Sequence, residues 1–237
     1  AHQPLRIGLL VNSLEVPAWC HEVLEEIVAS EWGEVALVLR NAAKPSRRPL
    51  SQRLAAAFNN AAYLVYERLD EKVYDSKCHP NAFESKTIKH LIPGVPVQDV
   101  VPRQTKFSDY FSDDDVQKIV DARIDVLLRW GFRILRGEVL SAAKHGIWSF
   151  HHGDSRVNRG SMPGFWEVML AEPTTGSVLQ ILSEQLDAGT IIERHNGATE
   201  MESVACNKHN LYWKSASMLP RNLKRLHDEG PGFLKRA

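Results

Sequence analysis

The chain carries no net charge, because its 29 Lys and Arg residues balance 29 Asp and Glu residues. Binding to the phosphate backbone of nucleic acid, or to an anionic membrane surface, depends on an excess of basic charge. No apolar run approaches the ~20 residues that cross a bilayer, and the N-terminus lacks the basic and apolar regions of a signal peptide. We therefore expect neither nucleic acid nor a membrane as a partner.

Cysteine is also scarce. The three cysteines, Cys20, Cys78 and Cys206, are an odd number and show no CxxC spacing. Such a set predicts neither a disulfide framework nor a zinc site built from thiolates, so we expect a reducing cytoplasm as the compartment. The chain begins at Ala1 and not at a methionine. Two interpretations stay open: the chain is a piece of a longer protein, or it is a processed protein. A homo-oligomer also stays open.

The apolar segments alternate between two patterns. Short apolar runs bounded by turn residues are typical of buried parallel strands, whereas apolar residues three or four positions apart indicate a helix. The first pattern occurs in residues 5–11, 35–39, 125–130 and 146–150, and the second in residues 17–27, 53–72 and 112–122. This alternation predicts an α/β fold, Rossmann-like, with a mostly parallel sheet and helices on both faces.

Two further segments are expected to be less regular. Residues 74–109 contain four prolines and little periodicity, so we expect irregular structure with one short strand. A helical turn is expected in residues 135–143. Ser112 is a plausible N-cap, because three aspartates follow it in the first turn, where negative charge suits the helix dipole.

Polar residues gather where the fourth strand ends. Residues 149–160 (SFHHGDSRVNRG) contain two histidines, one carboxylate, two arginines and two glycines. Ligands of open α/β sheets bind beyond the carboxyl ends of the strands, so residues 130–132 and 150–152 should reach the active-site edge. From the residues alone, His151 and His152 can be hydrogen-bonded structural imidazoles, catalytic groups, or metal ligands together with Asp154. A metal site is the weakest of these readings, because no further clustered donor completes a tetrahedron.

The order of these residues resembles the folate-dependent formyltransferase family, which includes glycinamide ribonucleotide, methionyl-tRNA and sugar N-formyltransferases. The family signature Asn-x-His-x-Ser-Leu-Leu-Pro-x-Tyr-Arg-Gly aligns without a gap with residues 149–160, and His151 falls on the catalytic histidine. Residues 163–166 (PGFW), Thr175-Gly176 and residues 186–191 resemble later family motifs, the last of which puts Asp187 on the catalytic aspartate. The resemblance covers residues 125–226.

The resemblance implies a formyl donor, 10-formyltetrahydrofolate, a small-molecule amine as acceptor, and no metal. His151 would donate to the oxyanion, Asp187 would orient it or accept protons through a water, and Ser149 would be a secondary donor. Residues 131–135 (GFRIL) resemble the family segment that lines the pteridine pocket. The residues implied to hold the folate are Gly131, Phe132, Arg133, Ile134, Leu135, Leu186 and Gly189.

Two departures from the family limit this expectation. Ser149 stands where the family has its catalytic asparagine, and no glycine-rich phosphate loop follows the first strand, so a ribonucleotide acceptor is not supported. The C-terminal RNA-binding domain of methionyl-tRNA enzymes and a basic charge are both missing, so a small amine such as an amino sugar or a specialised metabolite is expected.

We expect a catalytic domain in residues 1–198 and, packed on it, a helical extension in residues 199–237. Three functions stay open: an N-formyltransferase, a 10-formyltetrahydrofolate hydrolase or other one-carbon transferase on the same scaffold, and a catalytically silent folate-binding module. The last is suggested by Ser149 and the altered loop, because a fold does not fix a function.

Overall fold

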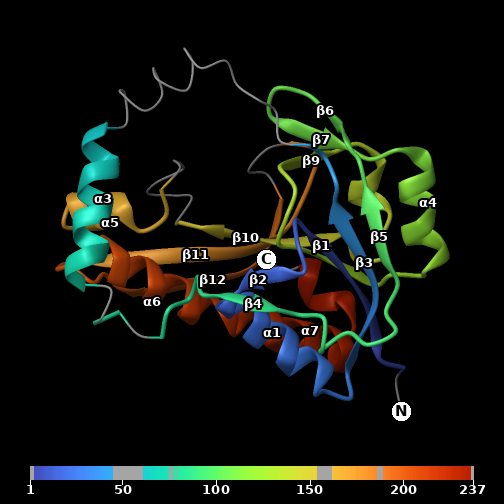
Figure 1. Ribbon diagram of the computed structural model, residues 1–237. Helices are drawn as coiled ribbons and strands as arrows, with labels where there is room; N and C mark the ends of the chain where they lie inside the picture. Colours follow the sequence, from blue (N-terminus) through green and yellow to red (C-terminus); the bar gives the residue numbers. More distant parts are fainter. Residues whose placement is uncertain are drawn as a thin grey trace.

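A computed structural model describes residues 3–44, 61–74, 77–78, 80–153, 162–185 and 189–235. Its centre is a seven-stranded sheet that crosses the molecule (Figure 1). From β10 to β5 all neighbouring strands are parallel, and β11 and β12 add an antiparallel edge. In order across the sheet the strands are β12 (Thr190–Ala198), β11 (Thr174–Ile181), β10 (Ile147–His152), β8 (Val126–Arg129), β1 (Leu5–Val11), β3 (Gly33–Asn41) and β5 (Val97–Val100).

The mostly parallel, Rossmann-like sheet predicted from the sequence is confirmed, and so are its four expected strands. Side chains alternate between the two faces of a strand, so a strand that is covered on both faces reads as a continuous apolar run. In β1, Leu9 packs into the hydrophobic cluster on one face and Leu10 into the cluster on the other, and both are fully buried.

Helices cover both faces of the sheet. Helices α1, α6 and α7 contribute to the cluster around Leu9, whereas α4 and a 3-10 helix contribute to the cluster around Leu10. No helix in the described ranges is long and apolar enough to span a membrane. The helices are α1 (Ala18–Val28), α3 (Ala61–Tyr74), α4 (Asp113–Asp121), α5 (Phe165–Met169), α6 (Val204–Ala216) and α7 (Met218–Glu229), and the 3-10 helices are η1 (Glu138–Ser141) and η2 (Pro231–Lys235).

The C-terminal helices share the core of the sheet. Met218 and Leu223 of α7 are fully buried in the same cluster as Leu9. The expected start of α4 is confirmed, since the side chain of Ser112 accepts a hydrogen bond from the Asp115 backbone N–H at 3.2 Å. The division of the chain at residue 198 remains a prediction.

The expectation of one short strand in residues 74–109 was wrong. Among the described residues of this segment there are four short strands, and three of them belong to small sheets. β4 (Ser85–Thr87) pairs with β2 (Glu15–Pro17), whereas β6 (Arg103–Gln104) pairs with β7 (Ser108–Tyr110), which in turn pairs with β9 (Ile134–Arg136). All three residues of β4 are exposed. Such strands lack the apolar alternation by which a sequence reveals strands. Of the expected helix in residues 53–72, the first eight residues lie outside the described ranges.

The cysteine prediction also needs correction. Cys78 and Cys206 form a disulfide across a sequence separation of 128 residues, with their Cα atoms 4.8 Å apart, and Cys20 is free and buried. Spacing along the chain cannot reveal such a pair, because only the packing of α6 brings Cys206 near Cys78. The pairing removes the cysteine-based argument for a reducing compartment.

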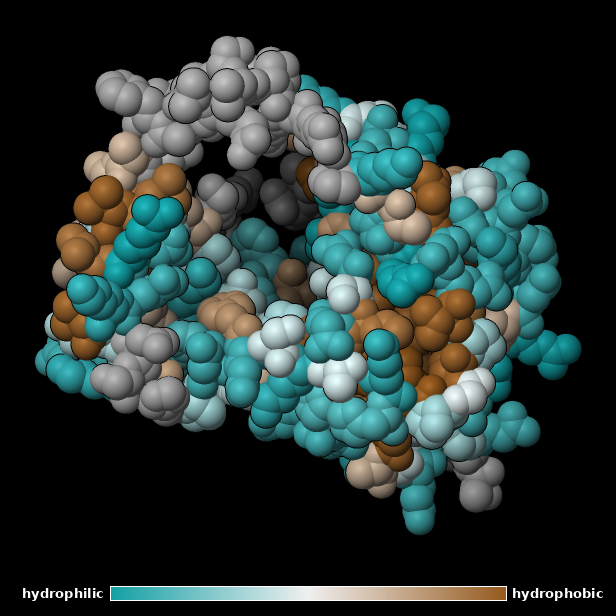
Figure 2. Space-filling model, viewed as in Figure 1, coloured by the Kyte–Doolittle hydropathy of each residue, from teal (hydrophilic) through white to brown (hydrophobic). Residues whose placement is uncertain are grey.

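Helix α3 holds α6 in place with a buried carboxylate. The Oδ2 atom of Asp70, which is 8% exposed, accepts hydrogen bonds from the Ala205 backbone N–H at 2.7 Å and from the Ser203 hydroxyl at 3.0 Å. A carboxylate is favourable there, because the N-terminus of a helix carries partial positive charge. The apolar side chains Val65, Leu69 and Val73 of α3 are instead exposed, and Figure 2 shows the apolar surface that gathers over this helix.

Candidate active site

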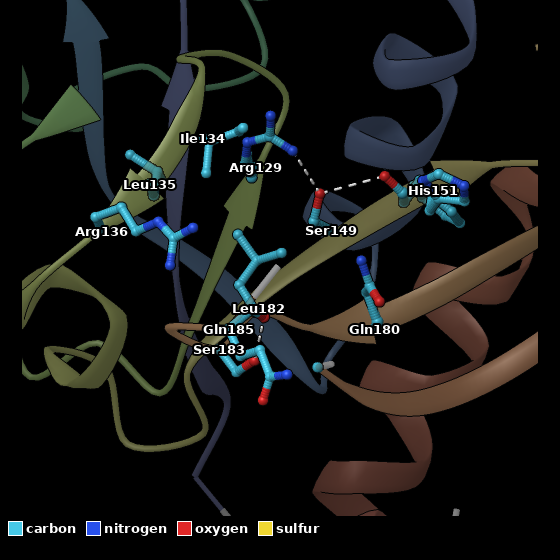
Figure 3. A pocket seen from close by; sticks show the side chains of 12 residues that line it. Arg129, Ile134, Leu135, Arg136, Ser149, His151, Gln180, Leu182, Ser183 and Gln185 are labelled. Atoms are coloured by element: carbon cyan, nitrogen blue, oxygen red, sulfur yellow. Dashed lines mark hydrogen bonds between the residues drawn. The ribbon is translucent and has the colours of Figure 1, made fainter. Parts of the chain in front are cut away.

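Two neighbouring cavities lie at the carboxyl ends of β8 and β10, where the sequence predicts the active site. The polar cavity has a volume of about 630 Å³, and its wall includes Arg129, Ser149 and His151 (Figure 3). The aromatic cavity, about 530 Å³, is lined by rings from β10, α1, α6 and the loop that follows β8. Arg129 and Ser149 contribute to both walls. The two cavities therefore share a boundary at these residues.

Ser149 and His151 lie two residues apart on β10, so their side chains point to the same face of the sheet. Both line the polar cavity. On the neighbouring strand β11, Gln180 pairs with Ser149 and Val178 with His151. The Nε2 atom of His151 is buried and has no hydrogen-bond partner in the described structure. An imidazole with an unsatisfied nitrogen at a cavity wall is available for a ligand.

A half-buried arginine, Arg129, contacts Ser149. The register pairs Leu128 of β8 with Trp148 of β10, so the next residues along the two strands, Arg129 and Ser149, project to the same face. The Nη1 atom of Arg129 donates to Ser149 Oγ at 2.9 Å, and Ser149 Oγ donates to the Phe150 carbonyl oxygen at 3.3 Å (Figure 3). Burial lowers the pKa of Arg129, and the more distant Asp109 carboxylate partly offsets this effect.

Phe150 and His152 alternate with the polar pair, and both line the aromatic cavity. The His152 ring stacks on Tyr212 of α6 with centroids 3.7 Å apart, and Trp19 of α1 meets it edge to face at 5.5 Å. Burial lowers the pKa of His152 to about 3, and the adjacent His151 adds to the shift. His152 is therefore a neutral ring of an aromatic wall at physiological pH.

The segment predicted to hold the folate divides between the cavities. Ile134 and Leu135 line the polar cavity, whereas Gly131 and Phe132 line the aromatic cavity. Arg133 lies on neither wall. Its Nε atom and its backbone N–H bind the fully buried carboxylate of Asp109 at 2.9 and 2.8 Å. In the described structure Arg133 thus fixes the loop, and its contact with a folate remains a prediction.

The remaining predicted residues come from the segment between β11 and β12. Gly189 lines the polar cavity. Leu186 and Asp187 lie outside the described residues, so the convergence of Asp187 with Ser149 and His151 stays a prediction. Within the described ranges no group of three His, Cys, Asp or Glu side chains could hold a metal ion. Asp154, the third member of the metal reading, also lies outside them.

Three kinds of residue line the cavities without having been predicted from the sequence: the charged Arg129 and Arg136, the polar Gln180, and the rings of Trp19 and Tyr212. One signal was available for Arg129, because a basic residue interrupts the apolar run VLLRW of an expected strand. No comparable signal marks Trp19 or Tyr212, since aromatic residues on helices are most often core residues.

Solved structures share this fold. Glycinamide ribonucleotide transformylase 1 from Symbiobacterium toebii superposes with a TM-score of 0.58 and 15% identity, over 95% of this chain and 89% of that one. A formyltetrahydrofolate deformylase from Pseudomonas syringae pv. tomato str. DC3000 superposes with a TM-score of 0.56 and 15% identity, over 94% of this chain and 62% of that one. At this level of identity the likeness establishes the fold.

Two curated relatives are methionyl-tRNA formyltransferases. The protein from Chlorobium chlorochromatii (strain CaD3) is 31% identical over 160 residues, 66% of this chain and 48% of the relative. The protein from Prochlorococcus marinus (strain NATL2A) is 27% identical over 110 residues, 46% of this chain and 33% of the relative. The chain therefore spans less than half the length of either relative, and no family model matches it. The sequence similarity and the shared fold together support a formyltransferase-family domain in this chain.

Proposed function

We propose that this domain transfers a formyl group from 10-formyltetrahydrofolate to the amine of a small molecule, such as an amino sugar or a specialised metabolite. The observation that carries the proposal is the polar cavity, where Ser149 and His151 of one strand meet the apolar side chains of Ile134 and Leu135. A formyltransferase needs this combination, because a flat pteridine requires an apolar wall and the reacting carbonyl requires donors.

The side chains of the polar cavity fit the formyl donor. Ile134, Leu135 and Leu182 supply apolar surface for a ring system, and Gln180 and Gln185 supply amide groups that can pair with ring nitrogens and a carbonyl. Gly189 lies on the same wall, where the absence of a side chain lets its backbone pack directly against the carbonyl group of Ile181. When bound there, the folate supplies an activated formyl carbon, and the polar end of the cavity surrounds it.

The aromatic cavity suits the acceptor. Its walls include Trp19, Trp130 and Tyr212, and aromatic faces stack against planar groups and against the C–H faces of sugar rings. The cavity meets the polar cavity at Ser149, so an amine held among the rings would reach the formyl carbon. This arrangement supports a small acceptor with a ring.

The chemical roles follow from the positions. His151 donates to the oxyanion from the wall of the polar cavity, with its unsatisfied Nε2 as the available atom. Neutral His152 is part of the wall of the aromatic cavity and maintains the shape of that cavity, where the acceptor binds. In this proposal Asp187 orients His151 or takes up the amine proton through a water.

Release of tetrahydrofolate from 10-formyltetrahydrofolate tests the proposal, with and without a panel of amines that includes nucleotide amino sugars and methionyl-tRNA. We expect release that depends on a small amine. Release at the same rate without any amine would establish a hydrolase instead, and release with methionyl-tRNA alone would contradict the small acceptor.

Folate binding is measured in parallel with 5-formyltetrahydrofolate, a stable isomer of the donor. A ligand at about 100 times its Kd adds roughly 2.7 kcal/mol to the free energy of unfolding, which a thermal shift detects. Stabilisation without any turnover would support the silent folate-binding module, and the absence of both would reject a folate site in this domain.

A further inference from the structure

Arg129 lies at the boundary of the two cavities and has no ion-pair partner among the residues that the structure describes. It ends β8, one residue after the fully buried Leu128. No carboxylate among the described residues forms an ion pair with it. Asp109, whose carboxylate raises the pKa of Arg129, already binds the guanidinium of Arg133 at 2.7 Å. A half-buried guanidinium on a cavity wall, with no ion-pair partner among the described residues, is suited to bind an anion, because burial of an unpaired charge is otherwise costly.

The donors of Arg129 are only partly used. Its Nη1 binds Ser149, and its Nε is buried without a partner in the described structure. Ser149 is committed as well, since a hydroxyl has one proton and this one goes to the Phe150 carbonyl oxygen. Ser149 therefore has no proton left for a substrate, although it stands where the related enzymes have an asparagine amide.

We propose that Arg129 is a catalytic residue that supplies the oxyanion donor at this position, with Ser149 as the group that orients it. This inference rests on the proposed formyl transfer. The amine lone pair forms a bond to the formyl carbon while the C=O π pair moves onto the oxygen, which Arg129 and His151 then hold. Collapse of the oxyanion restores the C=O bond and breaks the bond to N10 of the folate, and the proton lost by the amine ends on that nitrogen.

A cation at this boundary has a second effect, on the acceptor. A nearby positive charge disfavours a protonated amine and so lowers the pKa of the bound acceptor. Only the neutral amine has a lone pair with which to attack the formyl carbon. Arg129 thereby raises the fraction of reactive acceptor at a given pH, in addition to stabilising the oxyanion.

Formate is a direct probe of this anion site that requires neither folate nor turnover. Its binding is followed by saturation-transfer NMR of the formate C–H proton. We expect a millimolar Kd for the wild type and binding at least tenfold weaker in Arg129→Met. Arg136→Met is the matched control, because Arg136 lines the same cavity but already faces the Glu184 carboxylate at 3.7 Å. Its Kd should change less than twofold.

Equal formate affinity in wild type and Arg129→Met would overturn the inference, as would no wild-type binding up to about 100 mM, beyond the range of a specific anion site. Circular dichroism and urea unfolding verify that both variants fold. Because formate binding is read without a folate, a failure of the proposed formyl transfer is distinguishable from a failure of the anion site.

Kinetics separate Arg129 from Ser149. We expect Arg129→Met to lower kcat at least 100-fold with an unchanged KM for the folate, and to move the acidic limb of the kcat profile, which reports the bound acceptor, to higher pH. Ser149→Ala keeps the guanidinium and should cost less than tenfold. If Ser149→Ala is as harmful as Arg129→Met, and the double variant is no worse, the serine is the donor and the inference is wrong.

Discussion

The Oδ1 atom of Asn12 accepts a hydrogen bond from the backbone N–H of Phe132 at 2.9 Å. This bond ties the end of β1 to the loop that follows β8. Phe132 has a φ of 62°, in the left-handed region where a non-glycine residue is strained. Fixing Phe132 in this conformation places Gly131 directly against the backbone of β1, and the loop can then line both cavities.

The close approach at Gly131 predicts a severe effect of a single methyl group. A Cβ atom there would lie 2.5 Å from Asn12 N and from Val11 C, both backbone atoms. Gly131→Ala should lower the free energy of unfolding by about 1–3 kcal/mol, the usual range for overpacking, and should weaken folate binding. Urea unfolding measures the loss.

Gly232→Ala is the control for Gly131→Ala, because nothing lies within 4 Å of its added Cβ, and a change below about 0.5 kcal/mol is expected. Equal stabilities of the two variants would contradict the geometry.

The buried His152 makes stability depend on pH. Its pKa is lowered to about 3 in the folded state, against about 6.5 for an unfolded histidine. As pH falls below about 6.5, the unfolded chain takes up a proton that the folded chain does not. Stability is therefore complete above that pH and is lost as pH falls toward 3, by up to about 1.4 kcal/mol for each pH unit.

His152→Phe removes this titration and keeps a ring against Tyr212. Urea unfolding of both proteins between pH 4 and pH 7 is the measurement. The difference in stability between variant and wild type should shift in favour of the variant as pH falls. A difference that stays constant with pH would mean that His152 is not held neutral by burial.

The disulfide predicts a redox-dependent stability. Cys78 and Cys206 close a loop across 128 residues of sequence, and a cross-link of this kind typically adds about 2–4 kcal/mol. Reduction, or the double variant Cys78→Ser with Cys206→Ser, should lower the free energy of unfolding by that amount. Thiol titration of the unfolded protein should find one thiol, Cys20, without a reductant. Three thiols in the oxidised protein would show that the pair does not form.

The sequence predicted the strands that are buried on both faces. The runs in β1 and β3 are apolar because both faces of each strand are covered. A short apolar run of this kind, bounded by turn residues, is typical of a buried strand. The strands β4 and β5 could not be found in the same way. β4 is fully exposed, and β5 is an edge strand with one buried residue, Val100, so tertiary pairing and not composition makes them strands.

The candidate site likewise contains residues that the sequence predicted and residues that it did not. His151 and Ser149 were predicted because they lie in one short motif on one strand. The contact between Arg129 and Ser149 depends on the register of two strands that are 20 residues apart in sequence, which no local pattern encodes. The ring of Tyr212 lines the aromatic cavity from α6, a helix that Asp70 and the disulfide join to segments that are distant in sequence.

The most direct test of the proposed formyl transfer is the turnover of His151→Ala with 10-formyltetrahydrofolate and the acceptor that supports wild-type release. The control is His145→Ala, whose imidazole belongs to the opposite edge of the sheet, before β10 begins. We predict that His151→Ala loses at least about 100-fold in kcat, the lower end of the loss that follows removal of an oxyanion donor. Its stabilisation by 5-formyltetrahydrofolate should persist, and His145→Ala should match the wild type. Wild-type turnover in His151→Ala would contradict the account, because the imidazole at the wall of the polar cavity would then be structural.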